Sequence, residues 1–443
     1  MIKQTSISLP FVSGMFALGL LFLLLMPLKI GLLMAFGILI TLIAYYRTDF
    51  ALYFAVLAFP FLPDVLGLGM ILGVSLLSMY KTFVNGEPLI KGTIPYWAIF
   101  LFIAICIFNT FTSISFKGSI RDLGLNLSAI GFMIAMTNTI NDESKLYKIL
   151  LWMVISAVLV SLLGLYQYKV GVTINREWLD VENIPDVKAR VYSVFLNPNI
   201  LAEYLIMTIP IGVGFFWSSK SYFKKIGFLG AVGIMVLALV LTMSRGGWVG
   251  FAFSAIVFLL LIDPRWFIGL IPAAFLTFSM LPQSIANRIM SIGNLADSSN
   301  LYRFKVWDIT TEIIENYWQS GVGFGYIPYK TVFESYIRTM PIFHAHNTYL
   351  QTAAEQGIPG LILFLFMIFV ILKYSGIVLL RGRKNSFKYI MCSSLIASLC
   401  GALMHGMFEN ILYIPRIIFT FWIVVGFLMV FYKLNIDSEY DLK

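Results

Sequence analysis

Long apolar runs separated by short polar segments dominate the chain from residue 10 to residue 432. A bilayer core about 30 Å thick is crossed by a helix of roughly 20 apolar residues. The pattern predicts about fourteen spans; because two of them, 30–46 and 50–63, are weakly defined, we expect twelve to fourteen. The predicted fold class is an all-α polytopic membrane protein. The candidate spans are 10–28, 30–46, 50–63, 65–84, 94–113, 122–140, 147–169, 196–217, 225–243, 246–262, 265–281, 357–379, 388–408 and 413–432.

Composition agrees with this pattern and excludes several classes of protein. Hydrophobic residues make up 59% of the chain and charged residues 12%, whereas a soluble domain carries about 25% charged residues. A soluble enzyme, a disordered protein and a secreted disulfide scaffold are therefore excluded. The three cysteines, Cys106, Cys392 and Cys400, lie in apolar runs without metal-ligand or redox spacing, so we expect neither a disulfide nor a zinc site.

The basic residues indicate how the chain is oriented. With a cytoplasmic N-terminus, 17 of the 31 lysines and arginines fall inside and 14 outside. Eight of the outer basic residues belong to the long segments 171–195 and 282–356. Because long segments translocate largely regardless of charge, we leave these eight out, and 17 basic residues inside compare with 6 in short outer loops. The outer set holds 8 arginines and 6 lysines, and the inner set 4 and 13. The net charge of +9 therefore reflects membrane topology, and we expect no nucleic acid as partner. Arginine binds phosphate better than lysine does through its planar fork, so the outer arginines indicate an anionic ligand on that face.

Segment 282–356 is far longer than the other connections, and 302–317 has the amphipathic pattern of a helix. Connections of this length are usually functional or disordered; the aromatic content favours a folded extracytoplasmic cap. We therefore divide the chain into N-terminal transmembrane helices (1–189), a transmembrane core with arginine-bearing outer loops (190–281), a large extracytoplasmic loop (282–356) and C-terminal transmembrane helices (357–443).

Arg245 separates two apolar runs and is followed by Gly246 and Gly247. One interpretation is an interfacial turn in which Arg245 and Trp248 anchor the chain. The other is an anion site, in which glycines expose backbone N–H groups at a helix start and the guanidinium binds two phosphate oxygens.

A second polar block lies before the span at 196–217. Asn197 is placed to cap that helix, with Pro198 at its first position, which leaves Arg190 to face an outer cavity. Glu203 lies about one turn inside the span. An intramembrane carboxylate is a functional candidate by default, and a structural ion pair with an outer arginine is an equally good interpretation.

Two of the three histidines of the chain, His344 and His346, lie in the block that ends at Gly360. They are either surface histidines on a loop, metal ligands, or a general base with its neighbour. With no cysteine or third histidine nearby, we expect no metal site. Histidine suits proton removal near neutral pH, and Glu355 is a candidate partner of the base.

A last outer turn carries His405, Glu409 and, further on, Arg416. We expect Glu409 and Arg416 to form a structural ion pair. Taken together, an outer face with arginines and a histidine base suits a diphosphate-linked lipid. A G-x-x-x-x-G-K-[ST] loop is missing from the sequence, which disfavours an ATP-driven pump. An outer Asp-x-Asp pair is missing too, which disfavours metal-dependent sugar transfer.

Three of these blocks, in this order, resemble the O-antigen ligase family and its Wzy-type polysaccharide-polymerase relatives. The first is Arg190 with the Asn197-Pro198-Asn199 helix start, and the second is Ser244-Arg245-Gly246-Gly247-Trp248. The third reads His346-Asn347, nine residues, Gly357, two residues, Gly360, and is similar to the pattern H-[NSQ]-x9-G-x-x-[GTY] of the family. Arg303 with Trp307 and then Gly321-Val-Gly323 resemble the stretch before it. The resemblance covers roughly 190–432.

The resemblance implies a GT-C-type glycosyltransferase of the bacterial inner membrane that works on the periplasmic or outer face. Such an enzyme takes a glycan from undecaprenyl diphosphate, inverts the anomeric centre and needs no metal or other cofactor. It implies that Arg190 and Arg245 bind the diphosphate, with Arg303 as a further phosphate candidate, and that His346 deprotonates the acceptor. Residues on the acceptor side or in supporting positions are His344, Asn347, Tyr349, Glu355 and Asn199.

Three functions remain open from the sequence. A ligase passes the glycan to a sugar of the lipid A core. A polymerase of the same fold passes it to another lipid-linked repeat, and a related ligase passes it to a Gram-positive wall or another acceptor. The third alternative is a transporter of lipid-linked sugar, which is expected to carry inverted repeats and charges at mid-membrane.

Overall fold

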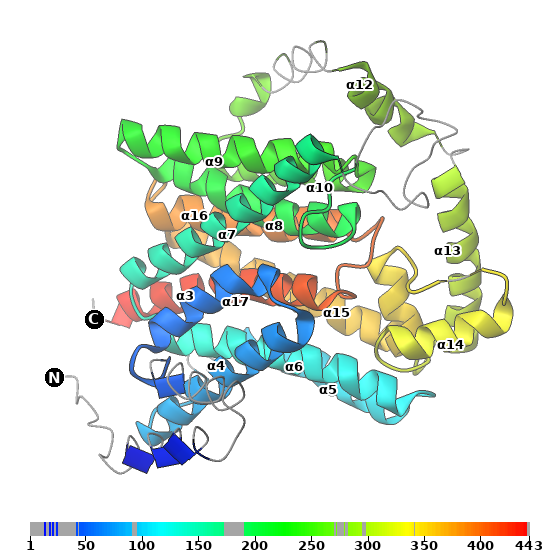
Figure 1. Cartoon of the computed structure of the whole chain (residues 1–443), viewed down its shortest axis with the longest axis horizontal. Coiled ribbons are helices and arrows are strands. Elements are labelled where there is room, and N and C mark those ends of the chain that lie inside the picture. The colour runs from blue at the N-terminus through cyan, green and yellow to red at the C-terminus, as the bar shows by residue number, and fades with distance from the viewer. Residues whose placement is uncertain are drawn as a thin grey trace.

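The computed structural model describes residues 44–90, 95–171, 190–269, 282–294, 298–340 and 342–440, with single residues between 13 and 42 and at 272 and 279. Every regular element among them is helical, which confirms the predicted all-α class. The helices run side by side as a bundle, and a smaller group caps one end (Figure 1). The bundle consists of α3 (Thr48–Ala58) with η1 (Phe59–Phe61), α4 (Asp64–Val84), α5 (Tyr96–Phe111), α6 (Phe116–Thr139), α7 (Glu143–Val170), α8 (Pro198–Ser218), α9 (Tyr222–Leu241), α10 (Arg245–Ile262), α15 (Thr348–Arg381), α16 (Phe387–His405) and α17 (Pro415–Tyr440).

Eight of the described helices are long and apolar enough to cross a membrane, namely α4, α7, α8, α9, α10, α15, α16 and α17. Two more segments, Thr48–Phe61 and Tyr96–Phe111, are apolar but shorter. The span predicted at 122–140 corresponds to α6, which is not among the eight, because polar residues such as Asp122 and Asn126 lower its hydropathy. The predicted spans 10–28, 30–46 and 265–281 lie wholly or mostly outside the described residues. The described part of the chain is thus a polytopic membrane bundle.

The core of the bundle forms around α17, whose membrane-length window is entirely buried. It packs against α6, α8, α15 and α16, and a helix that is apolar on all sides is expected at such a central position. By contrast, only 22% of the corresponding window of α9 is buried. Next to the core, α10 and α16 approach closely because Gly250 faces the backbone of Gly401. Small residues at crossing points allow this contact between membrane helices.

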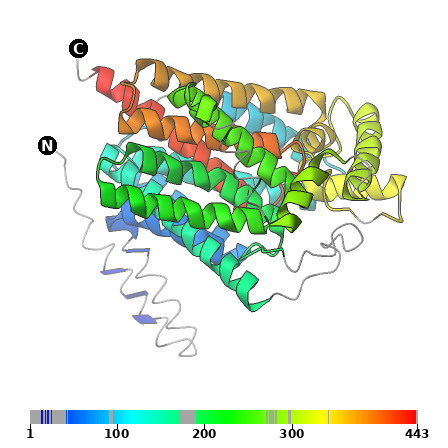
Figure 2. The ribbon, with the colours of Figure 1, turned by 90° about the horizontal axis from the view of Figure 1, so that it is seen from above.

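The cap consists of α12 (Gln283–Met290), η3 (Ser291–Gly293), α13 (Ser298–Asn316) and α14 (Tyr326–Tyr336), gathered at one end of the bundle (Figures 1 and 2). The helix predicted at 302–317 corresponds to α13. The helices α13 and α14 share an apolar cluster of their own that includes Val306, Ile313, Tyr329 and Phe333. The segment 298–340 is therefore a folded unit, as its amphipathic pattern predicts.

The cap is attached to the bundle through α15, which is bent at Gly357. This residue has φ +69° and ψ 177°, and a Cβ there would lie 2.6 Å from the carbonyl oxygen of Trp318. Gly321 has φ +66°, and its Cβ would lie 2.3 Å from the backbone of Glu355. The backbone N–H groups of Val322 and Ile358 donate hydrogen bonds across this contact, at 2.9 and 2.8 Å. Only glycine fits both places, which gives a physical reason for Gly357 of the third sequence block and for Gly321 of the stretch before it.

Candidate active site

Four connecting segments meet where the bundle joins the cap, and the two sequence histidines lie among them. Ala345, which separates the histidines, is buried and held on both sides. Its N–H donates to Oε1 of Gln351 at 2.6 Å, and its carbonyl accepts from Nε1 of Trp307 at 3.0 Å. His346 follows in the left-handed conformation with φ +49°. The backbone is thus fixed so that His344 and His346 leave it close together, with ring centroids 4.2 Å apart.

Asn347 ends this segment by capping α15. Its side-chain oxygen accepts from the N–H groups of Tyr349 and Leu350 at 2.9 and 3.0 Å. Its amide donates to the carbonyl of Met407 at 3.1 Å, which ties the histidine segment to the turn after α16. The supporting role predicted for Asn347 corresponds to this capping position.

Glu409, in the same turn, is the partner of the histidines. Its Oε1 lies 2.9 Å from Nδ1 of His346 and 3.2 Å from Nδ1 of His344. The backbone N–H of His346 donates to Nδ1 of His344 at 3.2 Å, so this nitrogen of His344 is an acceptor. The hydrogen bond to Glu409 accordingly belongs to His346, whose Nδ1 carries the proton. Its Nε2 is then left with the lone pair that a general base needs.

The protonation of the neighbours agrees with this assignment. Burial, the positive charge of Arg303 and the nearby His346 lower the pKa of His344 to about 3, so it is neutral at pH 7. Burial alone raises the pKa of Glu409, but the two histidines and Arg303 outweigh it and hold this pKa well below its ordinary value. An ionised carboxylate thus faces the neutral ring of His344 and Nδ1 of His346.

Glu409 also connects the histidines to the first arginine block. Its second oxygen accepts from Nδ2 of Asn199 at 3.2 Å, and Oδ1 of Asn199 accepts from Nη2 of Arg190 at 3.1 Å. Nε of Arg190 donates to the carbonyl of Thr242 at 2.9 Å, in the segment before Arg245. One continuous chain of hydrogen bonds therefore joins three of the polar blocks that the sequence analysis singled out.

Four arginines gather beside this chain. The pKa of Arg190 falls to about 9 because of burial and the nearby charges of Arg288, Arg245 and Arg303. Arg245 is mostly buried and donates to the carbonyl of Ser291 at 3.1 Å. Arg288 donates to the carbonyl of Met243 at 3.3 Å. Like charges held this close in a partly dry place favour an anion with more than one negative charge.

Gly247 has a different role from the one expected. The N–H of Gly247 donates to the capping oxygen of Ser244 at 3.3 Å, so it is not directed at a ligand. A Cβ on Gly247 would lie 2.7 Å from that of Ala202, and one on Gly246 would lie 3.1 Å from Nδ1 of His405. These glycines let α10 pack against α8 and α16, and the side chain of Arg245 stays a candidate anion-binding group of this block.

The predicted ion pair between Glu409 and Arg416 is wrong. Arg416 lies in the first turn of α17 and points to the other side, where its Nε is 3.2 Å from Asp64 and its guanidinium donates to the carbonyls of Val194 and Leu62. The turn between α16 and α17 directs Glu409 toward the histidines instead. Sequence reasoning missed Glu409 because 63 residues separate it from His346.

Of the two interpretations of Glu203, the structural ion pair with an outer arginine is wrong. Glu203 lies 3.5 Å from Nε2 of His405, the third histidine, and each is only 2% exposed. Their distance allows an ion pair, but Oε1 of Glu203 and both ring nitrogens have no hydrogen-bond partner among the described residues. This second histidine–carboxylate pair lies between α8 and α16.

Two predicted supporting residues lie away from the histidine rings. Glu355 is buried, accepts from the N–H of Gly325 at 2.9 Å and from Gln351 at 2.6 Å. It is therefore connected to the histidine segment through Gln351 and the backbone N–H of Ala345. The hydroxyl of Tyr349 donates to the carbonyl of Leu403 in α16 at 2.8 Å. The rings beside the histidines are Tyr413, 4.5 Å from His344, and Tyr302, 6.1 Å from His346.

His344, His346 and Glu409 also form a group that can hold a metal ion, since one ligand atom from each lies within 4.8 Å of the others. The sequence argument against a metal considered only cysteine and a third histidine as further ligands, and the carboxylate of Glu409 is a possible third ligand that it left out. In the structure the three atoms are engaged with one another and with the backbone of His346, which is the arrangement of a base and its orienting carboxylate. If the group is a base with its orienting carboxylate, activity should be insensitive to chelators, and this prediction separates it from a metal site.

Comparison with known proteins gives a match to a family model. Residues 230–365 match a family model described as O-Antigen ligase, which supports assignment to the O-antigen ligase family. The matched stretch contains Arg245, Arg303 and both site histidines, whereas Arg190 and Glu409 lie outside it and are joined to it by the geometry. No curated protein matches the chain.

Proposed function

We propose that this chain, a polytopic membrane protein of the O-antigen ligase family, transfers a glycan from undecaprenyl diphosphate to a hydroxyl of an acceptor sugar. The family match and the membrane helices support an enzyme of the ligase or polymerase type. The observation that carries the finer proposal is the hydrogen-bonded chain from His346 through Glu409 and Asn199 to Arg190. It supports a histidine base beside an arginine cluster.

In the proposed reaction, Nε2 of His346 removes the proton of the acceptor hydroxyl as its oxygen forms a bond to the anomeric carbon. The bond between that carbon and the diphosphate oxygen breaks, and undecaprenyl diphosphate leaves with the electron pair. Attack opposite to the leaving group inverts the anomeric centre. The proton stays on His346, where the carboxylate of Glu409 stabilises the imidazolium.

The arginines act on the leaving group. A diphosphate needs charge neutralisation rather than a strong acid, and guanidinium groups fixed in a partly dry place supply it. We assign Arg190 and Arg245 to the diphosphate. Arg303, whose charge reaches both Arg190 and Glu409, is a further phosphate ligand. The reaction needs no metal ion in this scheme.

The proposed orientation follows from the basic residues. The cytoplasmic side of the helices carries most lysines, so the site and its cap lie on the periplasmic or outer face of the inner membrane. The residues 282–356 and the turn after α16 then form the acceptor side, where Tyr302, Tyr413 and His344 offer rings for stacking against sugars.

A transfer assay with purified full-length protein tests this function. The protein is supplied with undecaprenyl-diphosphate glycan and with either a lipid A core saccharide or a second donor molecule. Transfer to the core saccharide is the expected result for a ligase, and growth of the lipid-linked chain indicates the polymerase alternative. If protein that binds the donor releases no undecaprenyl diphosphate with any saccharide acceptor, glycan transfer is contradicted.

A further inference from the structure

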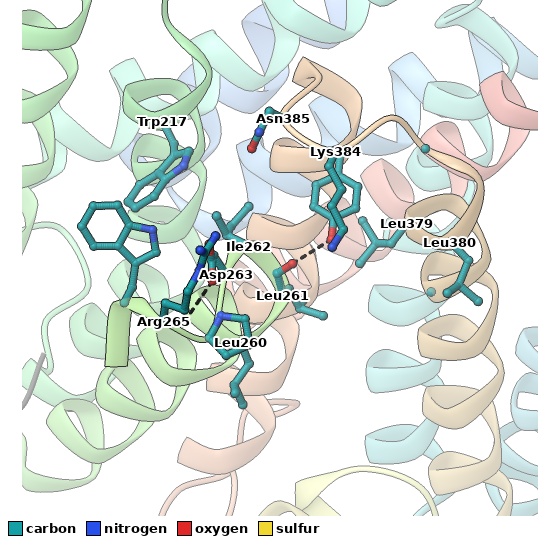
Figure 3. Close-up of a pocket in the computed structure, with 15 residues that line it drawn as sticks. Trp217, Leu260, Leu261, Ile262, Asp263, Arg265, Leu379, Leu380, Lys384 and Asn385 are labelled. Carbon is teal, nitrogen blue, oxygen red and sulfur yellow. Dashed lines mark hydrogen bonds and ion pairs between the residues drawn. The ribbon is translucent and has the colours of Figure 1, made fainter. Parts of the chain in front are cut away.

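A cavity of about 1010 Å³ lies at the end of the bundle opposite the candidate site (Figure 3). It is formed where α8 and α10 end and where α15 passes into α16. Trp217 and Arg265 lie on one side, and Leu379 and Leu380 lie on the other. No residue of the proposed transfer site lines it.

The position of the cavity relative to the membrane follows from α10. This helix begins at Arg245, in the candidate site, and ends at Ile262, which lines the cavity. Its 18 residues rise about 27 Å, close to the thickness of the hydrocarbon core. The cavity therefore lies at the other membrane surface, which the distribution of lysines assigns to the cytoplasm.

The polar rim of the cavity is positive. Asp263 is bound by its neighbour Arg265, with Nη2 2.7 Å and Nε 3.0 Å from the carboxylate. Hydrogen bonds from Arg265, together with the charge of Lys384, lower the pKa of Asp263 to about 2, so the pair is neutral overall. Lys384 adds a further positive charge, and the segment 381–388 around it carries two arginines and two lysines without an acidic residue.

The lower part of the cavity is apolar and open to the side. Leu380 and Leu260 are 89% and 51% exposed. The rings of Trp217 and Trp266 meet edge to face at 5.4 Å, and tryptophan is typical of the level of the lipid headgroups. A cationic rim above an apolar, tryptophan-lined wall matches a molecule with an anionic headgroup and acyl chains.

We propose that this cavity binds an anionic phospholipid of the cytoplasmic leaflet. The phosphate and headgroup lie against Lys384 and the Arg265–Asp263 pair, and an acyl chain lies along Leu260, Leu379 and Leu380. Basic cavities between membrane helices on the cytoplasmic side suit such headgroups. The site is separate from the transfer reaction and does not depend on the proposed function.

The test uses full-length protein in nanodiscs that contain a trace of photoreactive phosphatidylglycerol or photoreactive phosphatidylcholine, with mapping of the labelled peptides. We expect phosphatidylglycerol to label peptides from 260–266 and 379–389 in preference to phosphatidylcholine. Each basic residue near the surface contributes to the attraction, so Lys384→Gln should reduce this labelling about fivefold and Lys384→Gln with Arg265→Gln about thirtyfold.

The matched control is Lys148→Gln with Lys220→Gln, which removes two exposed charges that do not line the cavity and should leave labelling unchanged. Equal labelling by the two lipids overturns the proposal, as does full labelling of the Lys384→Gln variant. If inorganic phosphate alone displaces the lipid, the cavity is a site for a free anion and the lipid proposal is overturned. Lys384 is exposed, so this single variant is expected to fold even where the double variant does not.

Discussion

Two histidine–carboxylate pairs of the described residues have sharply different surroundings. His346 and Glu409 lie 2.9 Å apart in a hydrogen bond, and 26% of the His346 side chain is exposed. His405 and Glu203 lie 3.5 Å apart without a hydrogen bond, and both are 2% exposed. The first pair can meet a substrate, whereas the second is enclosed by helices. The same two residue types thus serve different purposes according to access and geometry.

The largest effect is expected for the accessible pair. His346→Ala should lower the rate of transfer by about 10²–10⁴-fold, because a positioned general base contributes that much. Donor binding should remain, since the arginines are untouched. The rate and the affinity for undecaprenyl-diphosphate glycan are measured separately on purified protein. Transfer at the wild-type rate rules out His346 as the base.

A smaller loss is expected where the arginine cluster is weakened. Arg245→Lys should reduce transfer about tenfold, because a point charge replaces a planar fork that binds two oxygens. Arg416→Lys is the control, since Arg416 binds Asp64 and backbone carbonyls away from the site. Equal effects of the two substitutions on transfer would indicate that Arg245 is an interfacial anchor.

The neutral His344 predicts a pH dependence of stability. Its pKa is about 3 in the folded protein and about 6.5 in an unfolded chain. Its contribution to stability is therefore fully present above pH 6.5 and is lost as the pH falls toward 3. The loss between pH 6.5 and 5 is about 1 kcal/mol per pH unit. In thermal unfolding in detergent, the stability of the His344→Asn variant should fall less steeply with decreasing pH than that of the wild type. An unchanged slope contradicts this prediction.

The smallest effect is expected for the enclosed pair. Glu203→Leu with His405→Leu should keep transfer within about threefold of wild type, because a buried ion pair is often replaced by apolar residues without loss. His405→Leu alone leaves a buried carboxylate without its partner and should cost about 3 kcal/mol of stability. Loss of transfer in a stable double variant would show that the enclosed pair takes part in the reaction.

The helices of the bundle could be predicted from the sequence to a large extent. The predicted spans 196–217, 225–243, 246–262 and 388–408 agree with α8, α9, α10 and α16 within three residues at each end. Apolar runs of membrane length define these helices locally, and Asn197 caps α8 as expected, accepting from the N–H of Asn199 at 2.8 Å. Local signals were sufficient wherever the apolar pattern alone decides the structure.

The site could be predicted only in part. The histidine and arginine blocks were found because each is a compact polar motif in an apolar chain. The partner of the base was not, because Glu409 reaches His346 through the turn between two distant helices. The same limit explains the wrong partners assigned to Glu203 and Arg416. Helix packing decides which acidic residue faces which base, and no local sequence pattern predicts this pairing.

The central claim, that His346 and Glu409 act together as one base, is tested most directly by a double-mutant cycle in the transfer assay. His346→Ala, Glu409→Gln and the double variant are compared at saturating donor. Because Glu409 acts through His346, the account predicts that the double variant is no slower than His346→Ala alone. If the two losses multiply, Glu409 acts independently of the histidine, and the proposed base is contradicted.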